Sequence, residues 1–518
     1  MWRQVKYLQC RRIRFVYQSR TSSSSTVGPR KDSSKRKVVE TESKLPFTIP
    51  LQWSRIKEKI NFEQIKEKTS LASSVVDAIK YGGNPQSRRD AIKDIISRTI
   101  MSKGQTQEEM GLLEAVRGLT DAAKQLNTRF GDGKIPLSVV NTPGLHYYLE
   151  HTESIQTPTW KRRKHLFCPK AKTEAVKKVR QYAHMTDIAY LYTRTEIQQS
   201  LDEMTRKKLL VNNGGGGGVW EIIHSDMNAM PGKPAHYFTV FHPNDNTAPE
   251  AYLVIRGTFS IPDIITDTQL DEVPFYDGSA HSGMQSSGIW IAEVYAKTLS
   301  ELENVKRSAI LNKPMKVKLI GHSLGGGAAA IATIHLRRSG RVKNVECFTI
   351  GSPPVVSEEL ASECADYVTS VVCDDDIVPR LTRTTILNLA QQVSVFDWTT
   401  FLRRDLEELV QELQYAVPFL LSSPDTREKL LKVIENYVLV AFAPEKGKTF
   451  ADDKKESVFT ENKLFQPGSL LHMYRTGRGF AATWVRRKMF AEIAFSRTML
   501  DDHFCEAYVK AADEILNG

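Results

Sequence analysis

The chain has 518 residues, of which 41% are hydrophobic, and its formal net charge at pH 7 is +11. Residues 1–37 contain eleven Lys and Arg residues and one acidic residue, so almost all of the net positive charge lies in this tail. Because a nucleic-acid-binding domain carries its positive charge on a folded surface, this distribution argues against a nucleic-acid partner. The length allows a large buried core.

Residues 1–45 are basic, rich in serine and poor in acidic residues, and we expect them to be disordered. This composition is typical of an organelle transit peptide, for a mitochondrion before a plastid. The alternative is a basic tail that contacts nucleic acid or anionic lipid. The six cysteines show no metal-binding spacing, which indicates reduced thiols in a protein that is not secreted. No apolar run approaches the roughly 18–20 residues of a transmembrane helix, so we expect any membrane contact to be peripheral.

Residues 46–170 have a helical pattern and no catalytic signature. A capping box at residues 106–109 precedes apolar residues at helical spacing. We expect this region to pack against the main domain. A basic cluster at residues 160–164 is consistent with a contact to acidic head groups, but a solvated face is the simpler interpretation.

Residues 171–518 alternate between strand and helix patterns. A helix is expected at about 173–196, a flexible glycine joint at 214–218, and further helices at about 288–304, after residue 323 and at about 505–516. The predicted strands are Val219–Ile223, Tyr237–Phe241, Tyr252–Ile255, Val317–Ile320, Glu346–Ile350, Tyr367–Cys373, the strand-like run Leu470–Tyr474 and a last strand at Met489–Phe495. This alternation predicts an α/β fold with a mostly parallel sheet covered by helices on both faces.

A Gly-x-Ser-x-Gly pentapeptide, residues 321–325, joins one of these strands to a helix of very small residues. A sharp strand-to-helix turn presents a serine hydroxyl clear of the backbone, but it crowds the neighbouring positions until only glycine fits. Gly321 and Gly325 occupy those positions around Ser323. The pattern predicts a nucleophile elbow with Ser323 as the nucleophile.

A serine nucleophile needs a base and a group that orients the base, and in this fold class they follow in the order serine, acid, histidine. Asp376 follows a predicted strand, but Asp374 and Asp375 serve equally well on spacing alone. His503 lies in a loop before the last helix, whereas His472 lies in a strand-like run. Position therefore favours His503 only mildly.

The oxyanion formed during acyl transfer needs fixed hydrogen-bond donors. The backbone N–H of Leu324, directly after the nucleophile, is one candidate. Thr258, at the end of an earlier predicted strand, offers its N–H and its hydroxyl as another. His322, inside the pentapeptide, is expected to shape the turn.

Together these motifs resemble the class 3 (fungal-lipase-type) lipases of the α/β-hydrolase superfamily, and within them the sn-1-specific diacylglycerol lipase branch. The resemblance covers roughly residues 170–516 and rests on Ile255–Ser260 with His281–Met284, Gly321–Ala328, Thr349–Pro354, Asp376–Arg380 and the late segments Pro467–His472 and Met499–His503 with Tyr508. It implies Asp376 as the acid, His503 as the base and Thr258 as an oxyanion-hole residue. Animal diacylglycerol lipases carry transmembrane helices ahead of this domain, and this chain shows no such run.

The resemblance implies a serine lipase or esterase that acts on glycerolipids at a membrane or lipid-droplet surface, with no metal and no organic cofactor. Phospholipase A1 or galactolipase activity is the alternative within the enzyme class. A non-catalytic lipid-binding or scaffold protein is the alternative from another class.

The connection between Asp376 and His503 is longer than the remaining strands and helices require, and residues 385–465 account for the excess. Apolar residues recur at helical spacing at 402, 406, 409, 410 and 413 and again between 430 and 438. We expect a helical insertion that caps the site, or one that merely adds packing at the edge of the sheet.

Overall fold

The computed structural model describes residues 147–148, 151, 165, 167–211, 217–245, 247–258, 272–304, 315–416, 423–425, 427–428, 431–432, 463–494, 496 and 498–518. All of them belong to one compact unit, Asn61–Gly518. The expectations for residues 1–45 and for most of 46–170, including the segments 106–109 and 160–164, lie outside the described residues.

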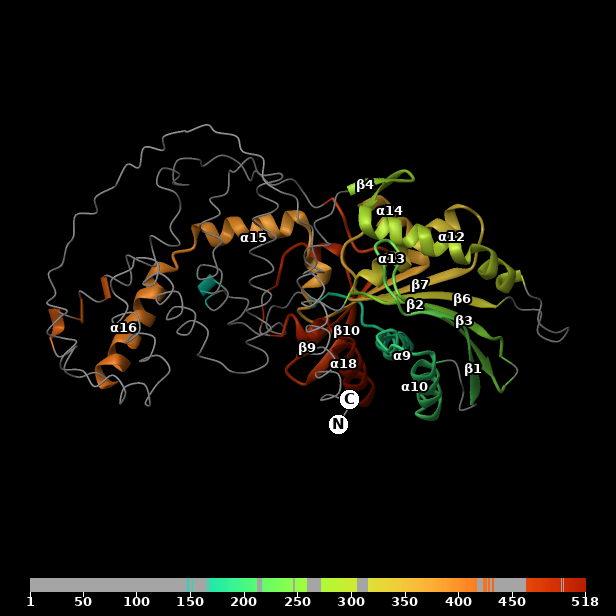
Figure 1. Ribbon diagram of the computed structural model, residues 1–518, viewed down its shortest axis with the longest axis horizontal. Coiled ribbons are helices and arrows are strands. Elements are labelled where there is room, and N and C mark those ends of the chain that lie inside the picture. The colour runs from blue at the N-terminus through green and yellow to red at the C-terminus, as the bar shows by residue number, and fades with distance from the viewer. Residues whose placement is uncertain are drawn as a thin grey trace, which may run out of the picture. The chain divides into compact units, whose positions relative to one another are not determined.

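The unit is built on an eight-stranded sheet in the order β1-β2-β3-β6-β7-β8-β9-β10 (Figure 1). The strands are Gly218–Asp226 (β1), His236–Pro243 (β2), Glu250–Ile255 (β3), Lys316–His322 (β6), Val345–Ile350 (β7), Val368–Cys373 (β8), Ser469–Thr476 (β9) and Gly479–Val485 (β10). Strands β3, β6, β7, β8 and β9 are parallel, and the antiparallel pairs lie at the two edges. The predicted α/β fold with a mostly parallel sheet is confirmed.

Helices cover both faces of this sheet, as expected. Ser282–Asn304 (α12) and Leu324–Arg338 (α13) lie on one face, and Thr173–Ile188 (α9) and Cys505–Asn517 (α18) lie on the other (Figure 1). Strand β3 shows why the two cores are separate. Its residues 251, 253 and 255 pack with α12 and α13, whereas Tyr252 and Val254 pack with α9 and α18, because successive side chains of a strand point to opposite faces.

The parallel central strands place their carboxyl ends at one edge of the sheet. Ile255 of β3 pairs with Gly321 of β6, and His322 of β6 pairs with Ile350 of β7. The segments that follow these strands therefore lie side by side at this edge, where α/β sheets bind their ligands.

Two sequence expectations differ from the structure. The helix predicted at about 173–196 is two helices, α9 and Arg194–Arg206 (α10), because Thr193 and Glu196 form a capping box that starts a new helix. The glycine joint at 214–218 ends in regular structure, since Gly218 is the first residue of β1, and residues 214–216 lie outside the described residues.

The strand predicted at Met489–Phe495 is wrong. Residues Arg487–Phe490 form a 3-10 turn, and the last strands are β9 and β10, which form a hairpin. Phe490 is buried with Val372 and Leu470, so the apolar run covers the sheet instead of extending it.

The helical insertion is confirmed where it is described. Arg383–Val395 (α15) and Thr399–Ala416 (α16) are helices, and α15 follows the acidic triplet with only a short 3-10 turn, Val378–Arg380, between them. The described part also contains Glu358–Glu363 (α14) and the small hairpin of Glu272–Phe275 (β4) and Gly278–His281 (β5).

Candidate active site

Ser323 lies at the turn between β6 and α13, fully buried and with a positive φ of 56°. Serine rarely adopts this conformation, and the hydrogen bond from its N–H to the Ile350 carbonyl (2.9 Å) helps to hold it. A Cβ on Gly321 would lie 2.5 Å from the backbone nitrogen of Gly326. A Cβ on Gly325 would lie 2.6 Å from the Arg256 carbonyl carbon. The two flanking glycines are therefore required by backbone contacts, as the sequence predicts for a nucleophile elbow.

His503, which follows Ser323 by 180 residues, lies next to it in the fold. It ends a 3-10 turn, Asp501–His503, directly before α18, and its Nε2 lies 3.1 Å from Ser323 Oγ. Its Nδ1 lies 3.0 and 3.1 Å from the two carboxylate oxygens of Asp376. Nδ1–H therefore donates to Asp376, and Nε2 is left to accept the proton of the serine hydroxyl.

The acid side chain is held by two further donors. Asp376 Oδ1 accepts a hydrogen bond from the Val378 N–H (2.9 Å), and Oδ2 accepts one from the Tyr508 hydroxyl (2.6 Å). Burial raises the pKa of Tyr508 well above its ordinary value, so this phenol stays a donor. The sequence reasoning gave Tyr508 no role, although its place in the segment around His503 was noticed.

The structure separates the alternatives that spacing left open. Asp374 and Asp375 are buried but do not contact His503 in the described hydrogen bonds, whereas Asp376 does. His472 lies in β9 and bonds through Nε2 to the Asp374 carbonyl (2.8 Å) and through Nδ1 to His165 (2.8 Å). The predicted set of Ser323, Asp376 and His503 is the one that the fold brings together.

His322 supports the base from the strand. Its Nε2–H donates to the backbone carbonyl of His503 (2.8 Å), and its Nδ1 accepts from the Tyr190 hydroxyl (2.8 Å). Burial lowers the pKa of His322 to about 3, so the ring is neutral and can make both bonds. Tyr190 lies between α9 and α10. The sequence pattern predicts one continuous helix there and so gives no reason to expect this contact.

Both predicted oxyanion-hole residues lie beside the nucleophile. Leu324 is the first residue of α13, so its N–H is one of the four that a helix leaves without an intrahelical partner. Gly257 lies so close to the elbow that an added Cβ would be 2.8 Å from Ser323 Cβ. Thr258 directly follows Gly257 in the chain, so the residue lies within one position of this contact.

The described residues contain no group of three or more His, Cys, Asp or Glu side chains arranged to hold a metal ion. A cleft of about 1070 Å³ lies between α9, α18 and the β9–β10 hairpin, lined by residues such as Lys170, Phe480 and Lys510. It contains none of the predicted site residues and has both charge signs in its lining, so we assign it no part in the chemistry.

Among the helices that the structure describes, none combines the length and the apolar character that crossing a membrane requires.

Comparison with known proteins identifies the segment that carries the site. The family model described as "Lipase (class 3)" matches residues 252–385, which include Thr258, Ser323 and Asp376. Diacylglycerol lipase-beta of Mus musculus is 24% identical over 307 residues, which are 52% of this chain and 43% of that protein. Diacylglycerol lipase-alpha of Rattus norvegicus is 24% identical over 294 residues, 52% of this chain and 27% of the relative. The chain thus spans less than half of the length of these relatives.

Solved structures of fungal lipases are also similar to the chain. A Rhizomucor miehei lipase propeptide complex, a deletion mutant, aligns with a TM-score of 0.40 and 14% identity, covering 67% of this chain and 82% of that one.

Proposed function

Because residues 252–385 match the class 3 lipase family model, we propose that the protein is a serine lipase that hydrolyses acyl esters of glycerolipids. The observation that carries the proposal is the buried hydrogen-bonded series from Ser323 Oγ through His503 to Asp376, with distances of 3.1 and 3.0 Å. A nucleophile, a base and an acid in this geometry perform acyl transfer.

The reaction follows from these contacts. Ser323 Oγ attacks the ester carbonyl carbon while His503 Nε2 takes the hydroxyl proton, and Asp376 stabilises the imidazolium that forms. The Leu324 N–H and Thr258 bind the oxyanion. His503 then gives the proton to the leaving alcohol, and an acyl-enzyme on Ser323 remains. Water, deprotonated by His503, attacks the acyl-enzyme and releases the fatty acid.

The proposed substrate is a diacylglycerol, presented at a membrane or lipid-droplet surface. This proposal is supported by the names of the two rodent relatives. A panel of emulsified diacylglycerol, phosphatidylcholine and galactolipid, assayed with equal amounts of the full chain, separates this activity from phospholipase A1 and galactolipase activity.

The first prediction tests the nucleophile. Ser323→Ala is expected to lower kcat by about 10⁶-fold and to abolish labelling by a fluorophosphonate probe, because the covalent step needs the hydroxyl. Ser339→Ala is the matched control, since Ser339 is an exposed serine at the far end of the same helix. It should keep both activity and labelling.

A folded Ser323→Ala variant that keeps a substantial fraction of the wild-type kcat contradicts the proposal. Failure of the wild-type chain to react with the probe favours the non-catalytic alternative instead.

A further inference from the structure

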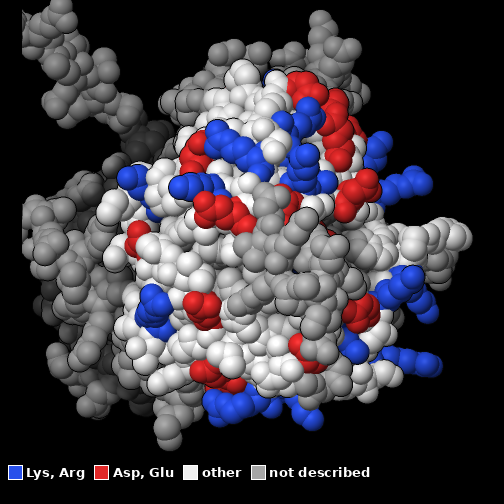
Figure 2. Space-filling view, turned by 90° about the vertical axis from the view of Figure 1, so that its right-hand side faces the viewer, with Lys and Arg blue, Asp and Glu red and all other residues white. Residues whose placement is uncertain are grey.

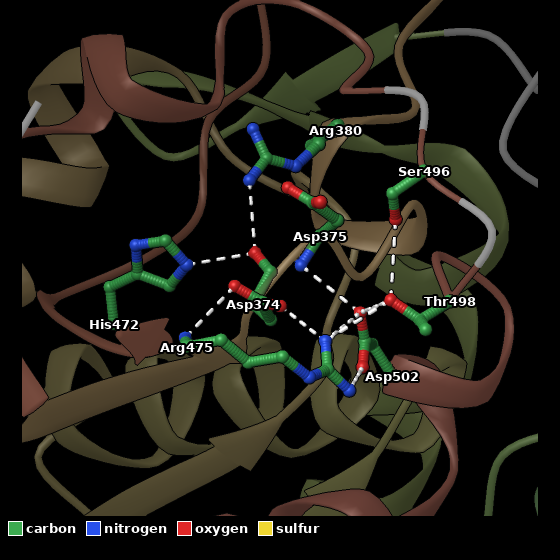
Figure 3. Close-up of polar contacts among 8 residues, drawn as sticks. All are labelled: Asp374, Asp375, Arg380, His472, Arg475, Ser496, Thr498 and Asp502. Carbon is green, nitrogen blue, oxygen red and sulfur yellow. Dashed lines mark hydrogen bonds and ion pairs between the residues drawn. The ribbon is translucent and has the colours of Figure 1, made fainter. Parts of the chain in front are cut away.

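One arginine contacts both of the loops that carry the acid and the base. Arg475, near the end of β9, lies between the loop that follows β8 and the loop that precedes α18 (Figure 3). Its Nη1 forms an ion pair with Asp374 Oδ2, and its own backbone N–H donates to Asp374 Oδ1 (3.2 Å). Its Nη1 and Nη2 also donate to the two oxygens of Asp502, at 3.1 and 2.7 Å. Asp374 lies two residues before the acid Asp376, and Asp502 is the residue directly before the base His503.

Further bonds join the same two loops. The backbone N–H of Asp375 lies 3.3 Å from Asp502 Oδ2, and the Thr498 hydroxyl donates to the same oxygen (2.8 Å). The backbone N–H of Ile377 donates to the Met499 carbonyl (3.2 Å). Asp502 thus receives hydrogen bonds from four donors, which suits a carboxylate with all of its lone pairs engaged.

The acid loop needs such support because its backbone is strained. Asp374 has a φ of 40°, which a residue with a side chain adopts only where its surroundings hold it. Its carbonyl accepts hydrogen bonds from Arg380 Nη2 (3.2 Å) and from His472 Nε2 (2.8 Å) (Figure 3). Arg475 binds the side chain of the same residue, so the turn that aims Asp376 at His503 is fixed from both sides.

The burial of the two carboxylates explains why a guanidinium lies between them. The side chains of Asp374 and Asp502 are 2% and 0% exposed, and that of Arg475 is 37% exposed. Two buried carboxylates so close together repel each other unless a cation lies between them. The planar guanidinium offers several donors in fixed directions and can bind both carboxylates at once, which a single ammonium group cannot do in the same geometry.

We propose that Arg475 is a positioning residue, which acts through Asp374 and Asp502 to hold Asp376 and His503 in the geometry needed for proton transfer. The inference rests on the proposed serine hydrolase function. It adds a residue that touches neither the substrate nor the reacting atoms but sets the relation between the acid loop and the histidine loop.

The test compares three variants of the full chain on a small soluble ester, p-nitrophenyl butyrate. Arg475→Met removes the charge and keeps the aliphatic stem. Arg475→Lys keeps the charge but loses the two-sided binding. Asp502→Asn keeps the shape of the side chain that Arg475 binds in the histidine loop and removes its charge. This variant tests the role of Arg475 even if Arg475→Met does not fold.

Each variant is expected to lower kcat per folded molecule by about 10- to 100-fold, the loss typical of a small misplacement of reacting groups. KM should stay within about twofold. The melting temperature separates this role from a merely structural one. Arg475→Lys should recover most of the melting temperature lost in Arg475→Met while its kcat stays low.

Arg478→Met is the matched control, because Arg478 is an exposed arginine at the turn of the same hairpin. It should have the kcat and the melting temperature of the wild type. Wild-type kcat per folded molecule in Arg475→Lys and Asp502→Asn overturns the proposal, as does a recovery of kcat in parallel with the melting temperature in Arg475→Lys. The proposed function fails separately, through activity in Ser323→Ala.

Discussion

Ser323 combines a strained backbone with complete burial, and its surroundings explain how the fold tolerates both. A non-glycine residue at a φ of 56° costs of the order of 1–3 kcal/mol. Its N–H is bonded to Ile350, and its carbonyl accepts the Gly326 N–H (2.9 Å). Glycines on either side let β6, α13 and the end of β3 approach closely enough to make these bonds. At the scale of single residues, the strained conformation of Ser323 depends on the absence of side chains at Gly321 and Gly325.

Gly325 offers a prediction at this scale. In Gly325→Ala the new Cβ would contact the Ile255 carbonyl oxygen and lie 2.6 Å from the carbonyl carbon and oxygen of Arg256, which cannot move without shifting the end of β3. We expect a loss of about 1–3 kcal/mol in the free energy of unfolding. We also expect a drop in kcat, because Thr258 follows that strand. Denaturant unfolding and ester hydrolysis measure the two effects.

Gly477→Ala is the control, since an added Cβ there meets nothing within 4 Å. Equal stability of the two alanine variants would show that the elbow tolerates a Cβ and that the steric argument is wrong.

At the scale of whole elements, the helical insertion follows the acid loop directly in the chain. Helix α16 buries Leu402, Leu406 and Val410 and exposes an ion pair between Arg403 and Glu407 (3.2 Å), as its amphipathic pattern predicts. Residues from the N-terminal region pack against it: Tyr147 Oη donates to Asp405 (3.0 Å), and His151 stacks on Phe401 at 3.8 Å between ring centroids. The insertion therefore packs against residues that precede the sheet in the chain, and it also connects directly to the acid loop through α15.

We propose that this insertion caps the site, and its replacement tests the idea. Ser323 has no exposed surface, so an ester can reach it only after some segment moves. Exchanging residues 395–445 for a short Gly/Ser linker should raise activity on p-nitrophenyl butyrate and lower activity on emulsified diacylglycerol. The same exchange in Ser323→Ala gives the background. An unchanged ratio of the two activities in a folded variant would reduce the insertion to packing at the sheet edge.

At the scale of the whole molecule, the balance of positive and negative charge differs between the described part and residues 1–37. On the face shown in Figure 2, Lys and Arg alternate with Asp and Glu, and no single sign dominates. Several of the charges in the described part are paired, as in Arg338 with Asp277 (3.2 Å) and Arg341 with Glu293 (2.6 Å). The excess of positive charge belongs to residues 1–37, which lie outside the described residues. The concentration of positive charge in residues 1–37 favours a targeting or membrane-anchoring role for the tail over a role in substrate binding.

We propose that the tail directs the protein to an organelle, the mitochondrion before the plastid. A fusion of residues 1–40 to a fluorescent protein is expected to enter that organelle, because cationic, acid-poor sequences of this kind are imported. The same fusion with Arg11, Arg12 and Arg14 replaced by Gln should remain in the cytosol. A diffuse signal from the unaltered fusion would leave the tail as a contact for anionic lipid.

The sequence by itself determined the features that local geometry enforces. The elbow could be predicted because a turn that presents Ser323 excludes every side chain at the two flanking glycines. Most strands of the sheet and most helices could be predicted because burial on a sheet imposes a periodic pattern, although β10 was missed. Family motifs, more than spacing, singled out Asp376 and His503 among their neighbours.

Tertiary structure decided what depends on residues far apart in the chain. The apolar run at Met489–Phe495 has the pattern of a strand, yet it folds over the sheet because Phe490 finds a buried place against Val372. Tyr190, Arg475 and Tyr508 carry no local signal, since their partners lie 27 to 132 residues away. These side chains can hold the acid or the base only because the sheet brings distant loops together at one edge. A local sequence pattern contains no information about such long-range contacts.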